Sequence, residues 1–207
     1  MLNWAITCYA IEGEPEVLKK IENAVLNHPV EDGSSDDWEG NVLVALGIEW
    51  DRYDFNKNER RRYMRGFIQQ EPWYNNGVLF LDAQEAWGVT DFGVVLEDNL
   101  PVKVYYTSEE PMMDVFETND FSGKYFRDRF YVDLCIKGDY QSEYFTNEES
   151  MWNYISEITG GEVKCMDDVE GFNEKHGSYE EEVADDDRVK EQYFEPSFVN
   201  IHKYKIV

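Results

Sequence analysis

The chain has 207 residues, of which 42% are hydrophobic and 15% aromatic, so it holds enough apolar material for the core of one large domain or two small ones and is not a disordered polymer. It has 44 acidic and 19 basic residues and a formal net charge of −25, and a surface of this sign repels nucleic-acid phosphates and anionic lipids. Direct nucleic-acid binding and membrane binding are therefore not expected.

The first 125 residues predict short strands mixed with amphipathic helices. Alternation around Trp4, Ile6 and Cys8 indicates a strand, and Pro15 stands where a first helix begins. In chain order we expect strand 2–11, helix 15–27, a short helix over 42–46, strand 67–70, a turn at 75–77, strand 78–84, helix 90–99 capped by Thr90, and strands 102–107 and 112–118.

The remaining residues continue this pattern of short elements. A strand over 129–137 places alternating apolar residues on one face, namely Phe130, Val132, Leu134 and Ile136. The capping boxes Thr146-x-x-Glu149 and Asp167-x-x-Glu170 predict two helices, of which the first covers 147–159 and is closed by Gly160 and Gly161. The acidic segment 178–195 is expected to be a self-repelling loop before a final strand over 198–207.

These elements predict an α+β fold, because strands and helices mix without a regular βαβ period. Strands 2–11, 78–84, 102–107 and 112–118 should form one antiparallel-rich sheet, with helices 15–27 and 90–99 on one face. Strand 129–137 and helix 147–159 either extend that sheet or begin a second, similar layer, so 126–207 is a C-terminal extension of region 1–125 or part of the same domain. The predicted core contains Trp4, Ile6, Ile21, Val95, Leu134, Trp152 and Ile155.

The cysteines and histidines are scattered. Cys8, Cys135 and Cys165 form no CxxC pair, and the three histidines have no metal-ligand spacing, so no metal site or cofactor is predicted. No apolar run approaches the roughly 18 residues of a membrane span, and Met1–Ala5 has no basic leader. We therefore expect a cytoplasmic protein with reduced, buried thiols.

Four short stretches occur in the order found in a known family. They are Asn3-Trp4, the run Gly47–Asp54, Ala86-Trp87-Gly88, and Val104-Tyr105-Tyr106 followed by Glu109-Glu110. Over about residues 1–125 the chain thereby resembles the YubB-type ferredoxin-like family of bacterial plasmids and phages. It departs from that family at Gly88-Val89-Thr90, where serine and prolines are usual. The resemblance implies a ferredoxin-like α+β sandwich encoded on a mobile element, and it implies no activity.

A first candidate site combines carboxylates with aromatic residues. Its members are Trp50, Asp51, Tyr53, Asp54, Trp87, Glu109 and Glu110. If these carboxylates converged in one cleft, they could perform acid–base chemistry or bind a hard cation. The alternative, which we favour, is that the aspartates cap turns while the aromatic rings pack. No nucleophile or phosphate-loop motif is present.

A second candidate is a basic patch within this acidic chain. Its members are Arg60, Arg61, Arg62 and Arg65, interleaved with Tyr63. Such a patch could contact phosphates, but the surrounding negative field opposes this. Pairing with acidic residues of the 178–195 segment, or of a second copy in a homo-oligomer, is the favoured interpretation.

The acidity itself provides the functional hypothesis. Carboxylates at roughly the spacing of phosphates can imitate DNA, so we predict a non-enzymatic protein that acts by binding a basic, nucleic-acid-handling host protein. The simplest alternative is that the charge serves solubility alone. A small enzyme, or a cation- or ligand-binding protein built on the carboxylate and aromatic candidates, is the other class that we consider.

Overall fold

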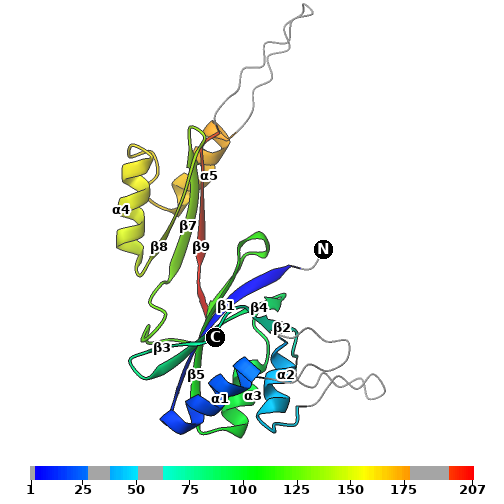
Figure 1. Cartoon of the computed structure of the whole chain (residues 1–207). Helices are drawn as coiled ribbons and strands as arrows, with labels where there is room; N and C mark the ends of the chain where they lie inside the picture. Colours follow the sequence, from blue (N-terminus) through cyan, green and yellow to red (C-terminus); the bar gives the residue numbers. More distant parts are fainter. Residues whose placement is uncertain (1–2, 28–37, 51–62, 178–195) are drawn as a thin grey trace, which may run out of the picture. The chain divides into compact units, whose positions relative to one another are not determined.

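The computed structural model describes residues 3–27, 38–50, 63–177 and 196–207 (Figure 1). The described part contains five α-helices, one mixed sheet of seven strands and one antiparallel sheet of three strands, which confirms the α+β class. The chain divides into two compact units. Unit 1 comprises Met1–Phe126 with Lys205–Val207, and unit 2 comprises Arg127–Tyr204.

The larger sheet forms unit 1. Its strands are β1 (Trp4–Gly13), β2 (Gly66–Ile68), β3 (Trp73–Asn75), β4 (Val78–Ala86), β5 (Val102–Glu110), β6 (Val115–Thr118) and β10 (Lys205–Ile206). They are ordered β10-β6-β5-β1-β4-β2, and β3 also pairs with β4. All neighbours are antiparallel except β10 and β6, which run parallel. The predicted strands 2–11, 78–84, 102–107 and 112–118 therefore do share one sheet.

Three helices cover one face of this sheet: α1 (Pro15–Asn27) and α3 (Phe92–Asn99), which were predicted there, and α2 (Glu39–Ala45) (Figure 1). Their apolar sides carry residues spaced three or four apart, which is why they pack toward the strands. Tyr9 and Ile11 of β1 meet Ile21 and Leu96 in one buried cluster. Because alternate strand residues point to opposite faces, only every second position of β1 reaches this core.

Unit 2 repeats the arrangement on a smaller scale. Strands β7 (Phe130–Ile136), β8 (Asp139–Phe145) and β9 (Phe198–Lys203) are ordered β8-β7-β9, and they are joined by α4 (Glu148–Ile158) and α5 (Met166–His176). The apolar alternation predicted for 129–137 is confirmed, since Val132 and Leu134 are buried with Met151, Ile155 and Phe172. This strand therefore belongs to a second sheet with its own core.

The alternation predicted for β1 is out of phase by one residue, so the opposite face of the strand is the buried one. Ile6 was placed in the core, yet it is 62% exposed, whereas its neighbours Ala5 and Thr7 are fully buried. Among the other predicted core residues, Ile21, Val95, Leu134 and Ile155 are buried, while Trp4 and Trp152 are half-buried.

Three predicted helix caps are displaced. The N-cap of α3 is Asp91 rather than Thr90, although the Thr90 hydroxyl accepts a hydrogen bond from the amide of Phe92. The N-cap of α4 is Asn147, whose side chain accepts from the Ser150 amide, and α5 begins with a capping box between Cys165 and Asp168. Cys165 is therefore exposed rather than buried.

Other boundaries differ from the prediction. The final strand divides at Tyr204, because β9 pairs in unit 2 and β10 pairs in unit 1. Strands β3 and β8 were not predicted, and a 3-10 turn over Pro111–Met113 separates β5 from β6. The acidic segment 178–195 lies outside the described residues. None of the described helices is long and apolar enough to cross a bilayer.

Candidate functional site at one end of the unit 1 sheet

The described members of the carboxylate and aromatic candidate come from separate elements of unit 1. Trp50 packs in the helix layer, edge-on to Trp38 with ring centroids 5.3 Å apart. Glu109 and Glu110 are the last two residues of β5, so they point to opposite faces of the sheet. Glu110 is buried and accepts a hydrogen bond from the Met113 amide. Asp51, Tyr53 and Asp54 lie outside the described residues.

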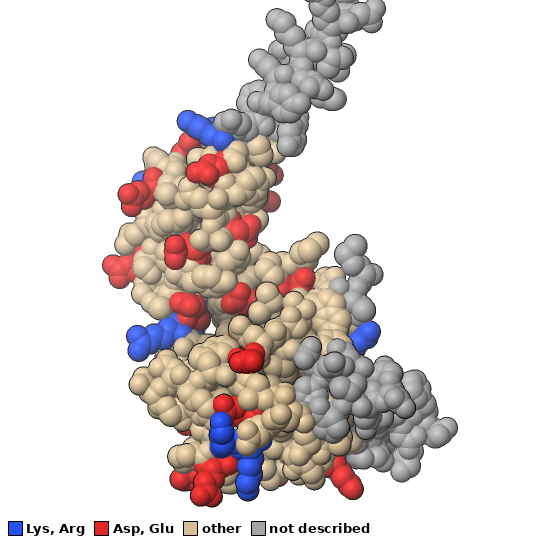
Figure 2. Space-filling model, viewed as in Figure 1, with Lys and Arg blue, Asp and Glu red and all other residues tan. Residues whose placement is uncertain are grey.

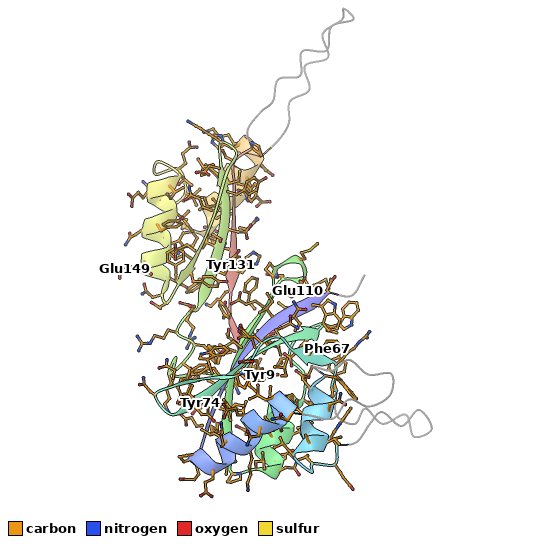
Figure 3. The ribbon with its side chains drawn as sticks, in the orientation of Figure 1. Tyr9, Phe67, Tyr74, Glu110, Tyr131 and Glu149 are labelled. Atoms are coloured by element: carbon orange, nitrogen blue, oxygen red, sulfur yellow. The ribbon has the colours of Figure 1, made fainter. Side chains whose placement is uncertain are left out.

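Several candidates nevertheless gather at one end of the sheet, where β1 and β6 begin and β4 and β5 end. Glu109 lies opposite Ile6, and the Trp87 amide donates to the Asn3 carbonyl at 3.0 Å. The carbonyl of Arg65 accepts from the amide of Ala86 beside them. Figure 3 places Glu110 at this end. The other basic candidates, Arg60, Arg61 and Arg62, lie outside the described residues.

Large apolar side chains are exposed at this end. Ile6 is 62% exposed, Trp87 53%, Met112 84% and Met113 49%. We call these four residues the apolar end patch. The backbone of Trp87 has φ 70°, and Gly88 after it has φ 118°. A residue as bulky as tryptophan adopts a positive φ only when its surroundings hold it there. The fold thus keeps an indole exposed at the sheet end.

A buried polar cluster lies on the helix side of the same end. One carboxylate oxygen of Glu85 accepts three hydrogen bonds, from the Tyr9 hydroxyl at 2.6 Å, the Thr90 amide at 3.0 Å and the Thr90 hydroxyl at 2.7 Å. The Thr90 hydroxyl also lies 2.9 Å from Glu39. Both glutamates and Tyr9 are fully buried. The cluster therefore joins β1, β4 and α2 to the turn that precedes α3.

The Thr90 hydroxyl has one hydrogen and two carboxyl neighbours, Glu85 at 2.7 Å and Glu39 at 2.9 Å. It can donate to one of them at a time, so both contacts are hydrogen bonds together only if one carboxyl group is protonated. Burial, and then the charge of Glu85, raise the pKa of Glu39 well above its usual range. The raised pKa favours the neutral, protonated form of Glu39.

Gly66 of β2 is the residue that makes room for Glu39. It pairs with Glu85 across the sheet, and a β-carbon at this position would lie only 2.3 Å from a carboxylate oxygen of Glu39. A cavity of about 40 Å³ borders Tyr9 and Thr90, which is room for a few water molecules. The side chains of Glu39, Glu85 and Tyr9 are fully buried in this arrangement.

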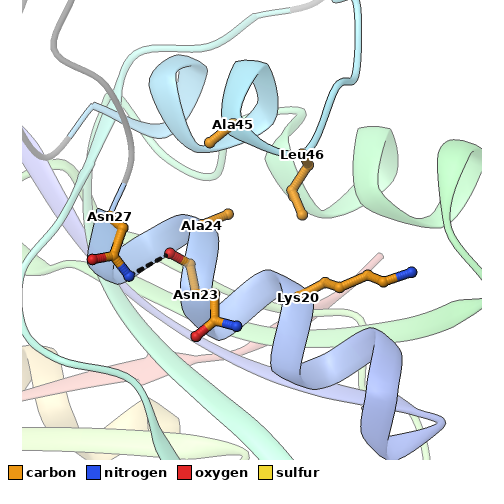
Figure 4. A pocket seen from close by; sticks show the side chains of 6 residues that line it. All are labelled: Lys20, Asn23, Ala24, Asn27, Ala45 and Leu46. Carbon is orange, nitrogen blue, oxygen red and sulfur yellow. Dashed lines mark hydrogen bonds between the residues drawn. The ribbon is translucent and has the colours of Figure 1, made fainter.

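A pocket of about 300 Å³ lies between α1 and α2 (Figure 4). It is lined by Lys20, Asn23, Ala24, Asn27, Ala45 and Leu46. Its volume is at the lower limit for small-molecule sites, and it contains none of the residues that the sequence singled out. Among the described residues, no group of three or more His, Cys, Asp or Glu side chains could hold a metal ion.

Comparison of the chain with protein-family models, with curated proteins and with solved structures gives no match.

Sequence reasoning missed the buried cluster, although two signals for it are present. Glu85 continues the inward-facing series of Leu79, Leu81 and Ala83, and Glu39 lies three and four residues before the buried Val42 and Leu43. An acidic residue at an apolar phase of a strand or helix predicts a buried carboxylate that needs a partner. The apolar end patch carries no such signal, because Met112 and Met113 follow no regular spacing.

Proposed function

We propose that the protein acts by binding another protein through the apolar end patch of unit 1. The observation that carries this proposal is the exposure of Ile6, Trp87, Met112 and Met113 at one sheet end. Exposed apolar residues gathered at one place and flanked by charge are typical of interaction sites, and methionine and tryptophan are enriched in interfaces. Glu109, opposite Ile6, and the exposed Arg65 provide such charge at this end.

The net charge indicates what kind of partner fits. With 44 acidic and 19 basic residues, at least 25 carboxylates lack a one-to-one basic partner within the chain. Acidic side chains are scattered over the visible face of both units (Figure 2). In unit 2, exposed Asp167, Glu170 and Glu174 form a row along α5. A basic, nucleic-acid-handling cytoplasmic protein is therefore the proposed partner, with the carboxylates in the place of DNA phosphates.

The strand order supports a ferredoxin-like assignment for the core of unit 1, which we also propose. Strand β1 leads through α1 to the β2–β3 edge, and β4 leads through α3 to β5. The spatial order β5-β1-β4-β2 corresponds to two interleaved βαβ units. This order agrees with the resemblance of the first 125 residues to the YubB-type family.

Affinity capture tests the proposed function. The full chain, immobilised at low salt, should retain a basic protein from a bacterial lysate, and both a salt gradient and duplex DNA should release it. The double variant Trp87→Ser with Met112→Ser should retain at least about fivefold less of that protein, since two central apolar contacts are lost.

The matched control is Val94→Ser, which removes a 45% exposed apolar side chain from α3, outside the patch. It should retain as much partner as the unmodified chain. The proposal fails if duplex DNA releases nothing, or if the double variant and the control retain equal amounts.

A further inference from the structure

Helices α4 and α5 leave one face of the unit 2 sheet uncovered. The side chains on that face are arranged in rows across the three strands. The core of unit 2 contains Val132 and Leu134, so the residues between them point to the opposite face. Cross-strand pairing places three rows on that face. We call it the tyrosine face, and its members are Tyr131, Asp133, Tyr140, Ser142, Tyr144, Phe198, Asn200 and His202.

The two outer rows of the tyrosine face are aromatic. In one row the ring of Tyr131 lies 4.9 Å from Tyr144 and 5.8 Å from His202, measured between centroids. In the other row, Tyr140 and Phe198 lie 5.8 Å apart, edge to face. Tyr140 is 70% exposed and Tyr144 43% exposed. Aromatic faces are thus accessible along both rows.

The central row holds one carboxylate in a fixed position. Oδ2 of Asp133 accepts a hydrogen bond from the side-chain amide of Asn200 at 3.0 Å. Nε2 of His202 lies 3.0 Å from Oδ1 of Asp133. A third of the Asp133 side chain stays exposed. Because each row is two residues from the next, the backbone of Asp133 lies about 7 Å from that of either aromatic row. The result is an oriented anion between aromatic rings.

We propose that the tyrosine face binds arginine or lysine side chains of the basic partner. This rests on the proposed function and assigns part of its contact surface to unit 2. A cation placed on Asp133 would gain a charge-assisted hydrogen bond, and its alkyl stem or guanidinium plane would lie on tyrosine faces. Asp133 and the net charge of −25 repel phosphate, so stacked nucleic-acid bases are the disfavoured occupant of the same rings.

A peptide titration tests this proposal on the full chain. The probe is a ten-residue peptide of alternating arginine and glycine, and calorimetry measures its dissociation constant at low and at high salt. Asp133→Asn should weaken binding about fivefold or more, and Tyr144→Leu should weaken it by a similar factor at unchanged net charge. A single-stranded oligonucleotide is titrated in parallel and should not bind.

Glu143→Gln is the matched control for Asp133→Asn. Glu143 is exposed, lies in the same sheet and pairs with Val132, so it belongs to the opposite face. Both substitutions remove one negative charge, and only Asp133→Asn removes the oriented carboxylate. Near-ultraviolet circular dichroism of each variant shows whether its tertiary structure is intact.

Three outcomes overturn the inference: no peptide binding by the unmodified chain, equal weakening by Asp133→Asn and Glu143→Gln, or binding of the oligonucleotide through Tyr144. The first two outcomes do not decide the proposed function, because the affinity capture tests the apolar end patch separately. If the peptide result is as expected while capture fails, the tyrosine face binds cationic side chains and the proposed partner is wrong.

Discussion

At the scale of single residues, the Thr90 hydroxyl determines how unit 1 holds two buried glutamates together. One hydroxyl between two carboxyl groups hydrogen-bonds to both only if one of them is protonated, and burial and the charge of Glu85 raise the pKa of Glu39. Folding therefore favours the protonated form of Glu39. In the unfolded chain the same group ionises at its ordinary pKa of about 4.3.

The first prediction concerns the pH dependence that follows. Because the pKa of Glu39 is raised in the folded state, its contribution to stability is complete below about pH 4.3 and is lost as pH rises toward the raised value, by at most about 1.4 kcal/mol per pH unit. In Glu39→Gln the amide donates to Thr90 without a titrating proton. Urea unfolding at pH 5 to 8 should therefore show a smaller decline for Glu39→Gln than for the unmodified chain.

Glu49→Gln provides the control, since Glu49 is exposed and its loss removes one charge near α2 without touching the cluster. Its stability should decline with pH as steeply as that of the unmodified chain. Parallel curves for Glu39→Gln and Glu49→Gln would contradict the assignment of the proton to Glu39.

At the scale of elements, β1 shows why periodicity predicts a strand more easily than the face it buries. The strand was predicted within two residues at each end, yet its phase was wrong, because Trp4, Ile6 and Cys8 look as apolar as Ala5, Tyr9 and Ile11. A one-residue change of phase exchanges the two faces completely. The decision depends on tertiary packing, because α1 and the distant α3 pack against Tyr9 and Ile11.

The second prediction tests that phase. Ile11→Ala should lower the free energy of unfolding of unit 1 by about 2 to 5 kcal/mol, because Ile11 is fully buried and its loss leaves a cavity. Ile6→Thr should change it by less than about 0.5 kcal/mol, since this residue is largely exposed and threonine suits a strand. Chemical denaturation measures both. A large loss for Ile6→Thr would place Ile6 in the core after all.

The displaced caps have a related cause. Near the start of α4, both Thr146 and Asn147 are good N-cap residues, and the choice depends on where β8 ends at Phe145. In α5 the capping box uses Cys165, a residue type for which sequence rules give no signal. Local patterns thus predicted that these helices exist, while the end of the β8 hairpin strand and the Cys165–Asp168 box decide where they begin.

At the scale of the whole molecule, the two units have separate cores. The cluster around Tyr9 and Leu96 contains residues of unit 1 only, and the cluster around Leu134 and Ile155 contains residues of unit 2 only. The sequence predicted the α+β class and left open whether strand 129–137 extends the first sheet. Periodicity could not decide this, because sheet membership is set by pairing between segments far apart in the chain.

The third prediction follows from the separate cores. Leu134→Ala should destabilise unit 2 by about 2 to 5 kcal/mol, since Leu134 is 1% exposed at the centre of its sheet. Hydrogen exchange followed by mass spectrometry should show lost protection in β7, β8 and α4, while β1 and β4 exchange at their original rates. Uniform loss of protection through both units would show that they unfold as one cooperative block.

The parallel pairing of β10 with β6 makes unit 2 an insertion within unit 1. Lys205 lies beside Glu117, and the amide of Val207 donates to the carbonyl of Thr118, so the chain completes the first sheet after it has formed the second unit. The backbone amide of Tyr204 donates to the carbonyl of Arg129. This hydrogen bond holds the beginning and the end of unit 2 close to each other. During synthesis on the ribosome, β1 to β6 emerge first and leave the outer edge of β6 unpaired until all of unit 2 has been made. A nascent chain stalled within unit 2 therefore exposes a strand edge that the finished protein covers with its own backbone.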